Sequence, residues 1–157
     1  MLDYQVKTLE AMRIAGYSIK VTSQQIASNN PIPAFWQEII NDGRFDKLQS
    51  LKGRCKADFG VTIMPTKNDM EYLVGAALEP GADEPQGYVL CDIPAGEYAV
   101  CQVTLETLES AWDDVSVWMM KKGYDWSDDA PTFEFYGEDH ATNDVLKVYI
   151  PIRKLEG

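Results

Sequence analysis

Residues 93–100 read IPAGEYAV, and residues 14–19 read IAGYSI. The Ala-Gly pairs of these two stretches, Ala15-Gly16 and Ala95-Gly96, lie 80 residues apart. Two further glycines with the same separation, Gly43 and Gly123, follow stretches whose apolar residues have helical spacing, and glycine commonly ends a helix. The chain therefore contains two copies of one structural pattern.

In each copy, the spacing of apolar residues predicts a strand, a helix and two further strands. Helical spacing predicts helices over residues 34–42 and about 107–122. The strand-like stretches are residues 6–21, 59–63, 71–78, 93–100, 132–136 and 146–153. Residues 79–87 read EPGADEPQG, the stretch richest in turn residues, and we expect the boundary between the copies there.

We predict an α+β fold of two pseudo-symmetric strand-helix-strand-strand units packed around a central ligand cleft. The first repeat covers residues of about 5–79 and the second about 88–154, within a single domain of residues 1–157. One unit of about 80 residues is too small to bury both its sheet and its helix well. We expect a ligand site where the two units meet, because such junctions are preferred ligand sites.

The composition limits the class of partner. The chain of 157 residues carries 25 acidic and 14 basic side chains, a net charge of −11. This balance argues against direct binding of nucleic acid, which needs clustered Lys and Arg, and favours cations or basic partners. No apolar run approaches the length of a membrane span, and no secretory signal opens the chain, so we expect a cytoplasmic protein without a membrane partner.

Cysteine and histidine give no sign of a metal or cofactor. The three cysteines, Cys55, Cys91 and Cys101, lack the paired spacing of a zinc site, and His140 is the only histidine. No nucleotide-binding glycine loop, nucleophile elbow or metalloprotease motif occurs. We predict neither a cofactor nor a metal site.

The stretch TFEFY at residues 132–136 carries the most informative chemistry. On a strand, Phe133 and Phe135 share one face while Glu134 and Tyr136 share the other, and we expect the two phenylalanines to face the helix-covered core. Glu134 is then either an ordinary surface acid, which the pattern alone favours, or a partly desolvated anion lining a cleft. In a cleft, a lipophilic cation would compensate its charge.

Other aromatic residues are candidates for the wall of such a cleft. Tyr149 alternates with the apolar residues of the last strand, and we expect it beside Glu134 if these strands pair. Tyr72 and Phe59 could wall the cleft from the first half. Trp36 and Trp112 lie on helical apolar stripes, where tryptophan more often belongs to the core than to a ligand site.

In this order of motifs the chain resembles the GyrI-like, AraC-type effector-binding domains, also found as drug-sensing domains of multidrug-responsive transcription regulators. The matching motifs are Ile93-Pro94-Ala95-Gly96-x-Tyr98, the helix of residues 112–123, Pro131-x-Phe133-Glu134-x-Tyr136, residues 148–152 and residues 72–75. They cover nearly the whole chain. Regulators of this kind usually carry a DNA-binding domain ahead of the effector-binding domain, and none fits before this strand pattern. We expect a stand-alone effector-binding protein or a segment of a longer regulator.

The resemblance implies a binding protein for bulky, aromatic, lipophilic cations. It assigns Glu134 as the acid that meets the cation and Tyr149 as an aromatic wall. It assigns Tyr136, Trp112 and Tyr72 to the ligand site more loosely. The assignments of Trp36 and Phe59 to the ligand site are looser still. It also suggests a separate transcription regulator as a partner.

Two other functions stay open at this stage. A hydrolase of strained, electrophilic alkylating compounds would use Glu134 as its general acid or base. An acidic inhibitor or interaction module would use the net charge to capture a basic protein. The oligomeric state is expected to be a monomer or a homodimer.

Overall fold

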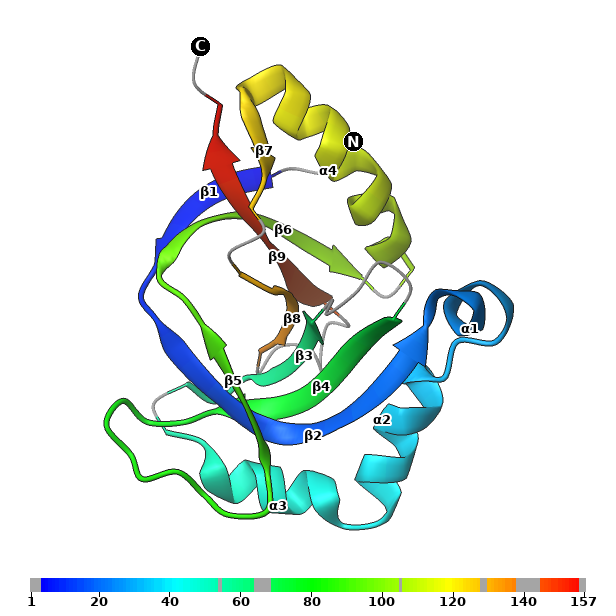
Figure 1. The fold of residues 1–157 in the computed structure, drawn as a ribbon, viewed down its shortest axis with the longest axis vertical. Helices are drawn as coiled ribbons and strands as arrows, with labels where there is room; N and C mark the ends of the chain where they lie inside the picture. The colour runs from blue at the N-terminus through cyan, green and yellow to red at the C-terminus, as the bar shows by residue number, and fades with distance from the viewer. Residues whose placement is uncertain are drawn as a thin grey trace. The chain divides into compact units, whose positions relative to one another are not determined.

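The chain divides into two units, which Figure 1 shows in a computed structural model. Residues 12–92 form the first unit, and residues 1–11 together with 93–157 form the second unit. The structure describes residues 4–53, 55–63, 69–104, 106–127, 130–137 and 145–155. Each unit combines antiparallel strands with helices, and the predicted α+β class is confirmed.

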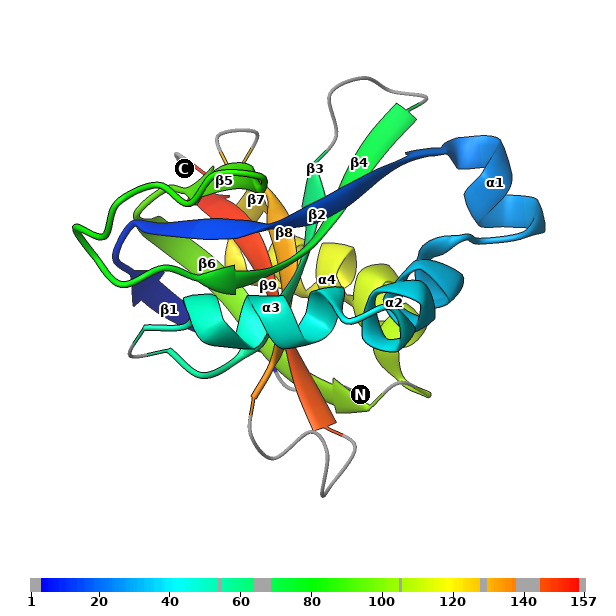
Figure 2. The ribbon, with the colours of Figure 1, turned by 90° about the horizontal axis from the view of Figure 1, so that it is seen from below.

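The first unit is a sheet with helices against one face. Its strands follow the order β3-β4-β2-β5. They are β2 (Met12–Thr22), β3 (Asp58–Ile63), β4 (Asp69–Ala77) and β5 (Val89–Ile93), and the helices are α1 (Ser23–Ser28), α2 (Ile32–Asn41) and α3 (Arg44–Leu51). The core forms where Phe35, Ile39 and Leu48 of α2 and α3 pack against Tyr72 and Val74 of β4. Figure 2 shows α1 continuing from the end of β2.

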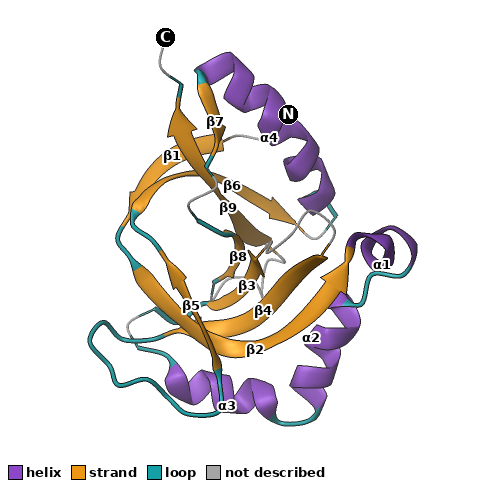
Figure 3. Cartoon of the chain, in the orientation of Figure 1, coloured by secondary structure: helices purple, strands orange, loops and turns teal. Residues whose placement is uncertain are grey.

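The second unit is built from both ends of the chain. Its strands follow the order β1-β6-β9-β8, and β7 also pairs with β9. They are β1 (Tyr4–Leu9), β6 (Gly96–Thr104), β7 (Tyr124–Trp126), β8 (Thr132–Tyr136) and β9 (Val145–Lys154). The long helix α4 (Leu108–Lys122), purple in Figure 3, covers one face of this sheet. Its residues Ala111, Val115 and Met119 pack on alternate residues of β6 and β9.

The predicted helices begin and end close to the expected residues. Gly43 follows α2 and Gly123 ends α4, both in the left-handed conformation that glycine adopts most readily, with φ of 90° and 80°. The helices α1 and α3 were not expected. The capping box of Thr22 and Gln25 that begins α1 is a sequence signal that could have revealed it.

The opening strand takes an unexpected partner. The sequence predicts that residues 6–10 begin the first repeat, whereas β1 pairs with β6 of the second unit, with Tyr4 opposite Cys101 and Leu9 opposite Gly96. Only residues 10 and 11 separate β1 from β2, which belongs to the first unit. The first unit is therefore inserted, in sequence, between two parts of the second.

Candidate functional site

Strand β8 presents Glu134 on the sheet face that α4 covers. In the register of β8 with β9, Glu134 lies opposite Val148, and opposite residues of antiparallel strands share a face. Val148 is fully buried in the cluster that α4 forms with the sheet. Glu134 is only half-buried. Its carboxylate therefore lies on the face of an apolar cluster while part of the side chain still meets solvent.

Tyr136 holds this carboxylate. Its hydroxyl donates a hydrogen bond to Oε1 of Glu134 over 2.7 Å, and its ring packs against the α4 cluster. The expectation that Glu134 and Tyr136 share one strand face is confirmed. An anion beside an aromatic ring, with partial desolvation offset by a hydrogen bond, is an arrangement that attracts an organic cation.

Tyr149 and the two phenylalanines lie on the opposite face. Tyr149 is the β9 residue opposite Phe133, and the two rings stack with centroids 4.6 Å apart and an angle of 7° between their planes. The prediction that Phe133 and Phe135 face the helix-covered core is therefore wrong, and so is the prediction that Tyr149 lies beside Glu134. The alternation of apolar residues does not show which face the helix covers, because both faces of this sheet are buried. Phe133 is 1% and Tyr149 7% exposed.

Three more predicted ligand residues belong to the first unit. Trp36 of α2 donates a hydrogen bond from Nε1 to the Tyr72 hydroxyl over 3.0 Å, and Tyr72 is a buried part of the helix-covered core. Phe59 is fully buried and lies opposite Gly75, on the other face of the sheet from Tyr72. Contact of these residues with a ligand stays a prediction.

The remaining predicted residues give less information. Trp112 belongs to α4, but its side chain is outside the described part of the chain, and His140 is also outside it. Across the residues that the structure describes, no group of three or more His, Cys, Asp or Glu side chains could hold a metal ion. Nor does any described helix have the length and apolar character needed to cross a membrane.

The first unit contains a cation–π contact that sequence reasoning missed. The guanidinium carbon of Arg44 lies 5.3 Å from the ring centre of Tyr17 and 5.9 Å from that of Phe35. The same guanidinium pairs with Asp42 over 2.8 Å and with Glu38 over 3.1 Å. Aromatic rings and carboxylates of this chain thus already hold one internal cation. Sequence spacing does not reveal this contact, because Tyr17 of β2 is far from Arg44 in the chain.

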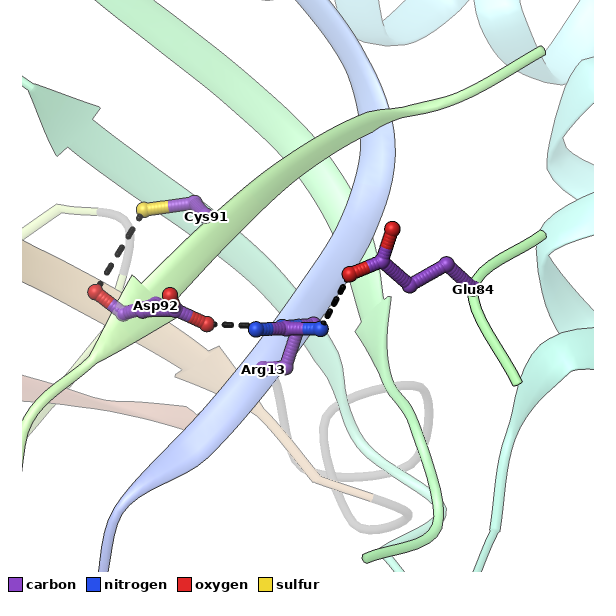
Figure 4. Close-up of polar contacts among 4 residues, drawn as sticks. All are labelled: Arg13, Glu84, Cys91 and Asp92. Atoms are coloured by element: carbon purple, nitrogen blue, oxygen red, sulfur yellow. Dashed lines mark hydrogen bonds and ion pairs between the residues drawn. The ribbon is translucent and has the colours of Figure 1, made fainter. Parts of the chain in front are cut away.

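A second polar cluster ties β2 to later residues of the same unit (Figure 4). Arg13 pairs with Glu84 over 2.6 Å and with Asp92 over 2.7 Å. The hydrogen bond from Arg13 holds the pKa of the Asp92 carboxyl below its usual value, whereas burial raises the pKa of the Cys91 thiol. A thiol with a raised pKa is a poor nucleophile.

Comparison with protein families shows which family the chain belongs to. Residues 5–152 match the model of Cass2, described as an integron-associated effector binding protein. The chain belongs to the Cass2 family. This membership confirms the resemblance to effector-binding domains that the sequence motifs indicate. A search of the curated proteins finds no match.

Solved structures share the fold of this chain. SAV2435, solved bound to tetraphenylphosphonium, is 17% identical with a TM-score of 0.79, over 97% of this chain and 94% of that one. An integron cassette protein from Vibrio cholerae is 11% identical with a TM-score of 0.67, over 96% and 95%. The C-terminal domain of EcmrR is 15% identical with a TM-score of 0.60, over 99% of both chains.

Proposed function

We propose that this protein binds bulky, aromatic, lipophilic cations and that Glu134 supplies the counter-charge. The observation that carries the proposal is the pair formed by the half-buried Glu134 carboxylate and the Tyr136 hydroxyl, 2.7 Å apart on the apolar face under α4. Partial burial removes some of the water that would solvate the Glu134 carboxylate. A bound organic cation would replace this lost interaction, and an aromatic ring of the protein would lie beside the cation.

Family and fold support the proposal. Effector binding is the description of the Cass2 family, and SAV2435 was solved with tetraphenylphosphonium, a large aromatic cation. Micromolar affinity requires about 8 kcal/mol, which burial of flat aromatic surface and one charge pair can supply. Because few directional hydrogen bonds would restrict the ligand, we expect several cations of this class to bind.

The test is a tryptophan-fluorescence titration with tetraphenylphosphonium and with triphenylphosphine oxide, a neutral aromatic analogue. Glu134→Gln keeps the shape of the side chain and removes its charge. It should weaken binding of the cation by about 1–3 kcal/mol, roughly 5- to 150-fold, and change binding of the neutral compound less. Tyr136→Phe should weaken the cation less than Glu134→Gln does.

Glu71→Gln provides the matched control. Glu71 is also half-buried on a strand and also accepts a hydrogen bond from a hydroxyl, that of Ser18, over 2.9 Å. The control variant should bind both compounds as the wild type does. Equal losses for the cation and the neutral analogue in Glu134→Gln would refute the counter-charge role, and absence of binding at high micromolar concentration would refute the function.

Hydrolysis of electrophilic compounds is the second candidate, and the same hydrogen bond favours it. A phenol hydrogen-bonded to a carboxylate can relay a proton between substrate and base. Incubation with a strained alkylating compound, followed by chromatography of the products, separates the two functions. Turnover that is lost in Glu134→Ala would favour an enzyme, whereas recovery of unchanged compound would favour a binding protein.

A further inference from the structure

Four aromatic rings gather on the face of the second unit's sheet opposite α4. The ring of Phe133 stacks on that of Tyr149 at 4.6 Å and meets the edge of Tyr98 at 5.8 Å. The ring of Phe135 lies 5.9 Å from Tyr149 at an angle of 52°. Tyr149 is therefore in contact with the residues on both sides of Glu134 in the chain.

These contacts fix the orientation of β8. The strand has five residues, and its described pairing with β9 covers only residues 133–135. Because side chains alternate along a strand, holding Phe133 and Phe135 on one face directs Glu134 to the other. Cross-strand packing of this kind adds to the hydrogen bonds of the ladder in holding a strand in position.

We propose that Tyr149 is a positioning residue, which acts on ligand binding through Glu134 from behind the sheet. The inference rests on the proposed function, since it assigns to Tyr149 the placing of the counter-charge instead of the ligand contact that the sequence predicts. Its ring does this work by stacking on Phe133. The 7% exposure of Tyr149 and its place on the face opposite Glu134 both separate it from a ligand that meets the Glu134 carboxylate.

The experiment compares Tyr149→Phe, which keeps the stacked ring, with Tyr149→Leu, which removes it. Tyr149→Phe should bind tetraphenylphosphonium within about twofold of the wild type. Tyr149→Leu should weaken it about three- to tenfold, the effect expected from losing an aromatic pair. In a Glu134→Gln background, Tyr149→Leu should cause no further loss, because the charge that it positions is already absent.

A matched control comes from another stacked pair in the same unit. The rings of Trp118 and Tyr124 lie 5.7 Å apart with an angle of 1° between their planes, and Tyr124 pairs with β9 at Lys154, away from β8. Tyr124→Leu should therefore leave the affinity for tetraphenylphosphonium unchanged. Should Tyr149→Leu fail to fold, the half-buried Phe135 offers Phe135→Leu, for which we expect a loss of about twofold or more.

The outcomes separate the inference from the proposed function. If Glu134→Gln binds the cation as the wild type does, the proposed function fails. If Glu134→Gln weakens binding while Tyr149→Leu does not, only the positioning role fails. The role also fails if Tyr149→Phe loses as much affinity as Tyr149→Leu, or if Tyr149→Leu weakens binding equally with and without the Glu134 carboxylate.

Discussion

Replacement of Tyr4 tests whether β1 is anchored in the second unit. The Tyr4 hydroxyl donates a hydrogen bond to the Ala111 carbonyl of α4 over 2.7 Å, between residues 107 positions apart in the chain. Its ring is 6% exposed and lies 5.5 Å from that of Trp118. Tyr4→Phe removes only the hydrogen bond and should lower the free energy of unfolding by about 1 kcal/mol.

Tyr4→Leu should cost more because it also removes the aromatic contact. Loss of the pair with Trp118 adds about 1 kcal/mol, and the volume left in the core adds a similar amount, for a total of about 3 kcal/mol. Urea unfolding followed by circular dichroism and tryptophan fluorescence would measure both variants. Val6→Ala, at an exposed position of the same strand, should stay within about 0.5 kcal/mol of the wild type. Wild-type stability for both Tyr4 variants would show that β1 is not anchored as described.

Alkaline pH provides an independent check on the same side chain. Burial, reinforced by the charges of Cys101 and Asp114, raises the pKa of the Tyr4 phenol above its ordinary value. Above pH 10 the unfolded chain therefore releases this proton while the folded protein keeps it, so the free energy of unfolding falls as pH rises. Tyr4→Phe lacks this proton and should lose less stability than the wild type over the same interval.

Two ion pairs provide the remaining predictions. The Lys52 side chain is 8% exposed and pairs with Asp58 over 2.9 Å. Asp58→Ala leaves this ammonium without its carboxylate, although the ammonium still donates a hydrogen bond to the Lys56 carbonyl over 2.8 Å. The variant should cost about 3 kcal/mol in urea unfolding, whereas Lys52→Met combined with Asp58→Leu should cost less. Arg13 lowers the pKa of Asp92, so their interaction stabilises the fold above the ordinary carboxyl pKa and is lost as pH falls through the lowered value. In acid unfolding titrations, Arg13→Gln should lack this loss of stability. A loss equal to that of the wild type would contradict the pairing of Arg13 with Asp92.

Local signals in the sequence predicted what depends on neighbouring residues. Gly43 and Gly123 mark the ends of α2 and α4, because a left-handed residue that ends a helix is a local requirement. The alternation in residues 132–136 correctly separated Glu134 and Tyr136 from Phe133 and Phe135. The spacing of 80 residues between the two Ala-Gly pairs indicated the repeated order of elements.

Choices that depend on distant residues were not accessible in this way. Alternation shows which side chains share a face but not which face a helix covers, so Phe133 and Tyr149 were assigned to the wrong sides. The error follows from β9, whose residues 148–152 are all buried and therefore carry no polar marker of an outer face. Likewise, nothing near residues 4–9 indicates that their partner strand begins at Gly96.

The pairing of β1 with β6 has a consequence for how the protein is made. Tyr4 and Cys101 are 97 positions apart, so β1 leaves the ribosome long before its partner strand is synthesised. The intervening residues 12–92 are the whole first unit, which can fold during this delay, since domains fold as units in the order of synthesis. We expect β1 to join last, after a long loop has closed, and this step to limit the rate of folding. The polar exposed residues Lys7 and Thr8 would protect the waiting strand from pairing with other chains.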